Sequence, residues 1–225
     1  MASFETHLTV TTAVVGVVTI PLLSSGIVDT NESVLLLFLG VIGGMLPDID
    51  SDNSIPVKIA FKILSLILPL LILFQFAGDL PLLKIGLFWI LASIGLNVVF
   101  TYGFLKLTVH RGIFHTIGMG FVLGESTALF MLHVLHTGNE LAVLSGIYVT
   151  FGFLLHLLLD ELYSVNLSNA TLKRSFGTAL KLYDKNNIFG SIFVNILAIG
   201  LLFVLPNFED VLLEIWTLLS SMAIF

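Results

Sequence analysis

The 225-residue sequence contains no cysteine. This absence excludes a disulfide framework, a thiolate metal site and a cysteine nucleophile, so any metal ion would have to be held by imidazole and carboxylate groups. Charged residues are also scarce, at 11% of the chain, whereas an ordinary soluble domain has about 25%. Only nine residues are Lys or Arg and the net charge is -6, which argues against binding to nucleic-acid phosphates.

Apolar residues make up 57% of the chain, and the mean hydropathy is +1.07. A soluble protein of this size could not bury so much apolar surface. The apolar residues fall into separate runs: Thr9–Val28, Ser33–Leu46, Val57–Phe76, Leu82–Leu105, Gly112–Leu135, Ala142–Leu162, Ile188–Leu205 and Val211–Phe225. Most reach the roughly 20 residues that a helix needs to cross a bilayer; the second run is short, and the last could lie in the interface.

We therefore predict an all-α fold, a single membrane domain (1–225) with about 7 to 8 transmembrane or half-membrane helices. A cleaved signal peptide is an alternative for the first run, but no Lys or Arg precedes it and no clear small-x-small cleavage site is visible.

The distribution of basic residues predicts the orientation. If every run crosses the membrane, the amino terminus and the even-numbered loops share one face, and the other face has Lys84 as its only basic residue. The shared face holds Lys58, Lys62, Lys106, Arg111, Lys173, Arg174, Lys181 and Lys185. Because cytoplasmic loops are enriched in Lys and Arg, we predict a cytoplasmic amino terminus.

Four polar clusters lie at ends of these runs, and the same threading places them all on the cytoplasmic face. They are His7, Asp48 with Asp50, His110 with His115, and His156 with Asp160. Such residues are metal ligands, so we predict one metal site formed by all seven. The alternatives are an interfacial role for His7 and a solvated turn for the aspartates.

Spacing within the clusters supports ligation. His156 and Asp160 are four residues apart, so on a helix they share one face and can bind one ion. His110 and His115 are five apart, so we expect His110 in a loop and His115 in the first turn of the next helix, with Gly112 allowing the bend. The set suffices for one or two ions; we favour zinc, with manganese or iron as alternatives.

Basic and acidic residues near the clusters suggest a reaction. The planar guanidinium of Arg111 suits a phosphate or carboxylate, although a plain positive-inside anchor is the alternative. The loop residues Lys173, Arg174 and Ser175 could bind a headgroup phosphate, or be an ordinary cytoplasmic loop. We expect metal-activated water to attack a lipid phosphoester, with Asp50 as a bridging or direct ligand and Asp52 or Glu161 as proton carrier.

The combination of motifs resembles the YdjM-type family of bacterial inner-membrane proteins, described as metal-dependent hydrolases. The matching elements follow the same order along the chain: His7, Leu46–Asp50, His110–His115 and His156–Asp160. The resemblance implies a multi-pass hydrolase of the bacterial inner membrane. Ser51 stands where the family pattern often has histidine, so that ligand is not carried over. A weaker similarity links the His-x-x-x-Asp helix to zinc-dependent phospholipases C.

Two other classes of function fit the same residues. A transporter would bind an ion without chemistry, but transporter sites usually lie near the membrane midplane, whereas these ligands lie at the ends of runs. A structural metal site in a membrane scaffold is the third possibility. Glu125, Asn97 and Asn195 lie near the middle of their runs, where polar groups need partners. We interpret His133 and His136, on the opposite face beside Glu140, as interfacial.

Overall fold

The computed structural model describes residues 3–50, 55–74, 76, 78, 80–99, 112–166, 171–172, 177, 180–205, 209, 211–213, 216–217 and 220. Apart from one short hairpin, the elements in these ranges are helices, as predicted. The chain divides into two compact units, the first formed by Met1–Pro47 with Gly112–Phe225 and the second by Asp48–Arg111.

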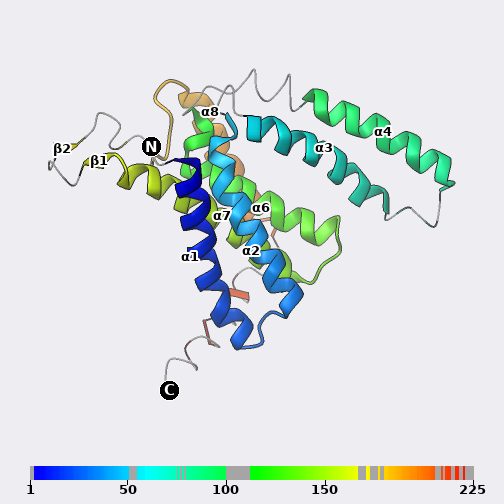
Figure 1. Cartoon of the computed structure of the whole chain (residues 1–225), viewed down its shortest axis with the longest axis horizontal. Helices are drawn as coiled ribbons and strands as arrows, with labels where there is room; N and C mark the ends of the chain where they lie inside the picture. The colour runs from blue at the N-terminus through cyan, green and yellow to red at the C-terminus, as the bar shows by residue number, and fades with distance from the viewer. Residues whose placement is uncertain are drawn as a thin grey trace. The chain divides into compact units, whose positions relative to one another are not determined.

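The first unit contains most of the helices (Figure 1). Its elements are α1 (Phe4–Ser24), α2 (Thr30–Met45), the 3-10 helix η3 (Ile113–His115), α6 (Ile117–His133), α7 (Asn139–Leu162), the antiparallel strands β1 (Val165–Asn166) and β2 (Thr171–Leu172), and α8 (Ile188–Leu202). The second unit contains α3 (Ile55–Phe74) and α4 (Leu82–Val98). The 3-10 helix η1 (Leu46–Asp50) follows α2 directly and contains the boundary between the units.

Capping side chains determine where the helices begin. The Ser3 hydroxyl accepts a hydrogen bond from the Thr6 backbone N–H at 3.2 Å, so α1 begins at Phe4, five residues before the apolar run. His7 was predicted to precede the first helix, and this detail is wrong because it lies within α1. Asp29 and Glu32 form a capping box at the start of α2.

Helix lengths differ from those predicted from the apolar runs. Among the described residues, three helices are long and apolar enough to cross a membrane: Phe4–Ser24, Thr30–Asp48 and Asn139–Leu162. The second run was predicted to be short, but the Asp29 cap and the continuation into η1 extend it. The run Gly112–Leu135 yields only the 17 residues of α6, because Thr116 caps that helix.

Helix α7 is the central element of the first unit, where it packs against α1, α2 and α6. Three glycines of α2, Gly40, Gly43 and Gly44, allow close contact between helices. A Cβ atom at Gly43 would clash with the backbone of Val149 in α7, and one at Gly44 would clash with the Thr11 side chain in α1. These glycines let both neighbours approach α2 closely, which brings α1 and α7 together beside its carboxyl end.

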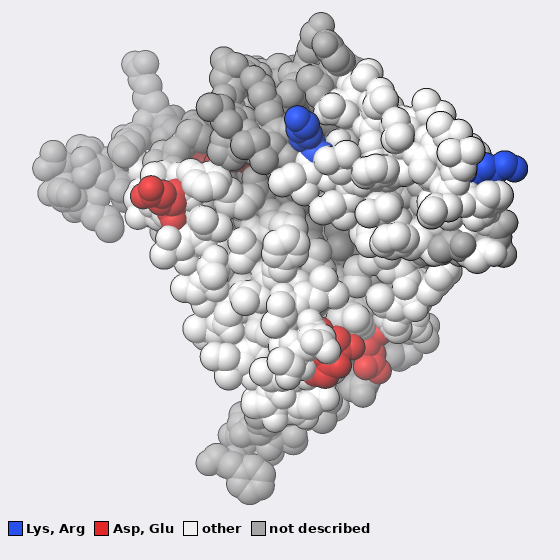
Figure 2. All heavy atoms as spheres, turned by 45° about the vertical axis from the view of Figure 1, so that its right-hand side comes forward, with Lys and Arg blue, Asp and Glu red and all other residues white. Residues whose placement is uncertain are grey.

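The outer surfaces of the helices are apolar. Val17 on α1 and Phe193 on α8 are about two-thirds exposed, and large apolar side chains are exposed on every long helix. Most described side chains on the face shown in Figure 2 are uncharged. Exposed apolar surface of this extent suits contact with lipid.

Candidate metal centre

The carboxyl end of α7 carries two buried polar side chains. His156 and Asp160 are 1% and 3% exposed and lie one helical turn apart, as their spacing predicted. Charged and polar groups are rarely so buried unless they are paired or coordinate a metal ion. Their burial makes this end of α7 the natural place to look for a site.

Helix α1 adds a third side chain to this pair. The His7 ring is 2% exposed and stacks on the His156 ring, with 3.7 Å between ring centroids and 8° between ring planes. Its Nε2 atom lies 3.2 Å from Oδ1 of Asp160. His7, the first motif along the chain, therefore meets His156 and Asp160, the last motif, in the interior of the first unit.

A backbone carbonyl of α2 orients His156. Its Nδ1 atom lies 2.7 Å from the carbonyl oxygen of Gly44. A carbonyl oxygen only accepts hydrogen bonds, so Nδ1 carries the proton and donates it. In the neutral ring Nε2 then carries the lone pair, the arrangement in which a histidine binds a metal ion.

The end of α2 explains why this carbonyl is available. The last carbonyl groups of a helix lack intrahelical partners. α2 ends at Met45 and continues as the 3-10 helix η1, in whose pattern the Gly44 carbonyl would pair with the N–H of residue 47; Pro47 has no N–H. The Leu46–Pro47–Asp48 segment thus does more than supply an aspartate, because it leaves the Gly44 carbonyl free to accept from His156.

The three side chains could hold one metal ion. His7, His156 and Asp160 each offer a ligand atom, and these atoms all lie within 4.8 Å of one another. Two imidazole nitrogens and a carboxylate oxygen form a donor set that accepts zinc, manganese or iron. The hydrogen bond from His156 to Gly44 is the outer-shell contact that such a ligand usually makes.

His115 lies next to this group. It is 1% exposed, and its ring centroid is 6.1 Å from that of His156, with the rings inclined at 73°. We predicted that it would lie in the first turn of the following helix; instead it ends η3, and Thr116 caps α6. The N–H of Ile117 donates to the Lys181 carbonyl at 3.0 Å, which ties the segment after β2 to this end of α6.

The other predicted site residues are placed less completely. Asp48 lies in η1 and is half-buried, and Asp50 ends that helix. Six predicted residues lie outside the described part of the chain: Asp52, His110, Arg111, Lys173, Arg174 and Ser175. Their roles remain predictions.

Glu161 and two other residues have contacts that the sequence did not indicate. A Glu161 carboxylate oxygen accepts a hydrogen bond from the Gly177 N–H, so this side chain holds the loop after α7 in addition to being a candidate proton carrier. Gly44 acts through its carbonyl, which carries no side-chain signal. Thr11 lies one turn after His7 in α1, where it is fully buried and packs against Gly44. Its four-residue spacing from His7 was the one sequence feature that placed it on the same face of the helix.

Comparison with known proteins gives a match at the level of family. A family model described as YdjM inner membrane protein matches residues 1–167. The matched range contains His7, His115, His156 and Asp160. A search of curated proteins and a search of solved structures found no significant match.

Proposed function

The chain belongs to the YdjM inner membrane protein family, and we propose that it is a metal-dependent hydrolase acting on a phosphoester at the cytoplasmic headgroup level. The observation that carries this proposal is the meeting of His7, His156 and Asp160 inside the first unit, with ligand atoms within 4.8 Å of one another. Buried ionisable groups within a membrane protein are costly and usually functional.

The proposed ligand set extends beyond these three residues. A ring nitrogen of His115 lies within 4.8 Å of one of His156, which is close enough for both residues to bind one ion. Asp48, Asp50 and His110 are proposed as further ligands because the threading predicted from the sequence puts their motifs on the same face of the membrane. A full set of this size could hold one ion or two, and zinc is our first choice among zinc, manganese and iron.

The proposed reaction is hydrolysis of a phosphoester. A divalent metal, when bound, acts as a Lewis acid and lowers the pKa of a bound water towards about 7. The water oxygen forms a bond to phosphorus, the bond from phosphorus to the ester oxygen breaks, and the leaving oxygen takes up a proton. Asp52 or Glu161 is proposed to accept the proton from the water, and Arg111 to bind the phosphate oxygens.

The loop after α7 is the proposed headgroup contact. Lys173, Arg174 and Ser175 carry cationic and hydroxyl groups that suit a phosphate. Two hydrogen bonds support this role. The Glu161 carboxylate accepts from the N–H of Gly177, which follows these residues, and the Lys181 carbonyl accepts from the N–H of Ile117, at the start of α6. A lipid or lipid-linked phosphoester is the favoured substrate, because a soluble ester would not require a scaffold embedded in lipid.

Orientation can be tested with reporter fusions. We expect a fluorescent reporter that matures only in the cytoplasm to give signal when it follows Asp50, because basic residues favour that face. The matched control places the reporter in the α1–α2 loop after Ser25, where a periplasmic phosphatase reporter should be active instead. Periplasmic activity after Asp50 would contradict the proposed orientation.

The hydrolase proposal is tested with the purified full chain in detergent. After removal of metal by a chelator, we expect activity on a panel of phospholipids and polyprenyl phosphates to return with zinc, manganese or iron. The rate with a lipid phosphoester should exceed that with a water-soluble phosphoester by at least about tenfold, since remote binding energy contributes to the rate. Metal-loaded protein that hydrolyses no ester on the panel would contradict the proposal.

One observation favours a second candidate function, a structural metal site in a non-catalytic membrane protein. His7, His115, His156 and Asp160 are all buried, and structural zinc sites are closed whereas catalytic sites keep an open coordination position. Slow exchange of bound metal and no access for small anions would favour this candidate. Rapid competition by phosphate for a coordination position would favour the hydrolase.

A further inference from the structure

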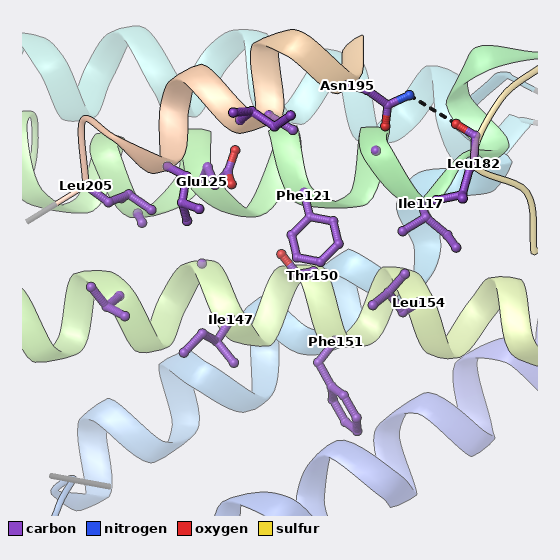
Figure 3. A pocket seen from close by; sticks show the side chains of 17 residues that line it. Ile117, Phe121, Glu125, Ile147, Thr150, Phe151, Leu154, Leu182, Asn195 and Leu205 are labelled. Carbon is purple, nitrogen blue, oxygen red and sulfur yellow. Dashed lines mark hydrogen bonds between the residues drawn. The ribbon is translucent and has the colours of Figure 1, made fainter. Parts of the chain in front are cut away.

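A cavity lies between α6, α7 and α8 of the first unit (Figure 3), and its lining does not include His7, His115, His156 or Asp160. Its volume is about 580 Å³, within the range of about 300–1,000 Å³ typical of small-molecule sites. Most of the side chains that line it are apolar, and Phe121 and Phe151 are among them. A molecule bound here would be largely apolar.

One acidic side chain faces this apolar cavity. Glu125 on α6 lines the cavity and is 7% exposed, and its Oε2 atom has no hydrogen-bond partner among the described residues. None of the described lining residues is Lys, Arg or His. An ionised carboxylate is costly to bury without a cation, so a cationic ligand would supply the charge that the protein does not.

The other polar side chains of the cavity also offer acceptors. Asn195 on α8 uses its amide N–H groups, since Nδ2 donates to the carbonyl of Leu182 at 3.1 Å (Figure 3) and to the carbonyl of Ser191 at 2.8 Å. Thr150 on α7 uses its hydroxyl hydrogen, which it donates to the Gly120 carbonyl at 3.3 Å. What Asn195 and Thr150 have left is acceptor capacity on oxygen, so this cavity favours a ligand that donates hydrogen bonds.

We propose that this cavity is a binding site for a hydrophobic amine, an apolar molecule with a protonated nitrogen. Its N–H groups donate to the Glu125 carboxylate, with the oxygens of Thr150 and Asn195 as further acceptors, while its apolar body contacts the lining side chains. Aromatic lining residues suit such a ligand because cations are attracted to ring faces. This site is separate from the metal centre, and its existence does not depend on hydrolase activity.

Two matched probes test the proposal on the purified full chain in detergent. Dansylcadaverine has an aromatic body and a primary amine, and its N-acetyl derivative keeps the body but loses the cation. We expect fluorescence titration to give at least about tenfold tighter binding of the amine, since the buried carboxylate pairs only with the cation. Equal affinities for the two probes would overturn the proposal and indicate a purely apolar occupant such as a lipid chain.

Variants locate the binding within the cavity. Glu125→Gln should weaken amine binding by at least about tenfold and leave binding of the acetylated probe unchanged, while Ala198→Phe should weaken both by filling the cavity. Glu140→Gln is the matched control, because Glu140 is exposed at the start of α7 and does not line the cavity. Unchanged amine binding in folded Glu125→Gln protein would overturn the assignment; if that variant does not fold, the comparison of probes on the unaltered chain decides.

Discussion

Replacing His156 with Ala is expected to remove the bound metal ion almost completely. His156 is the residue that joins the cluster, since it stacks on His7, lies beside His115 and is four residues from Asp160. Loss of a residue that merely orients a ligand typically costs 10–100-fold in metal affinity, so loss of the ligand itself should cost more than about 100-fold. The metal content per chain of the purified protein, measured by inductively coupled plasma mass spectrometry, checks this expected loss.

The matched control is His133→Ala. His133 is an exposed histidine at the carboxyl end of α6, and it is not among the candidate ligands. We expect this variant to keep its metal content. Equal metal content in the two variants would contradict the assignment of His156. His156→Ala also creates a buried cavity and removes the hydrogen bond to the Gly44 carbonyl. Gel filtration and thermal unfolding should therefore confirm that the variant is folded.

The second large effect is expected in Asp160→Asn, which should lower hydrolysis of the favoured lipid phosphoester by at least about 100-fold. The substitution keeps the size of the side chain but removes the negative charge that faces His7 Nε2 and would face a metal ion. Initial rates should be measured at saturating metal and substrate, so that the loss is assigned to the reaction rather than to weaker binding of either.

Glu140→Gln is the matched control for that loss. It also replaces a carboxylate of α7 with its amide, but Glu140 is exposed in the first turn of α7, at the opposite end of the helix from Asp160. We expect its rate to stay within about threefold of the unaltered protein, as is usual for positions without direct contact to the reacting groups. A loss as large as that of Asp160→Asn would show that the effect is not specific to the cluster and would contradict the role given to Asp160.

The sequence predicts one part of the candidate site well. The four-residue spacing of His156 and Asp160 depends only on helical periodicity, and α7 places both on one buried face as expected. His7 could be assigned only through the threading of the helices, because a single histidine has no spacing to interpret. Its stacking on His156 depends on the close approach of α1 to α2 at Gly44, a tertiary contact.

Other features could not be predicted because no side-chain pattern encodes them. The hydrogen bond from His156 to Gly44 uses a backbone carbonyl, and its availability depends on where α2 ends. Helix ends were also the weakest part of the fold prediction, since capping by Ser3 and Thr116 moved them relative to the apolar runs. Glu125 and Asn195 were recognised as polar groups in mid-run, but the cavity that they share depends on how α6 and α8 pack.

X-ray absorption spectroscopy at the edge of the bound metal tests the central claim most directly. The proposal predicts that nitrogen and oxygen atoms surround the metal at about 2.0–2.2 Å. The spectrum should also contain scattering from the more distant ring atoms of at least two imidazoles. In His7→Ala protein the imidazole contribution should fall by one ligand. A shell of oxygen alone, or a spectrum unchanged by His7→Ala, would contradict a metal centre formed by His7, His156 and Asp160.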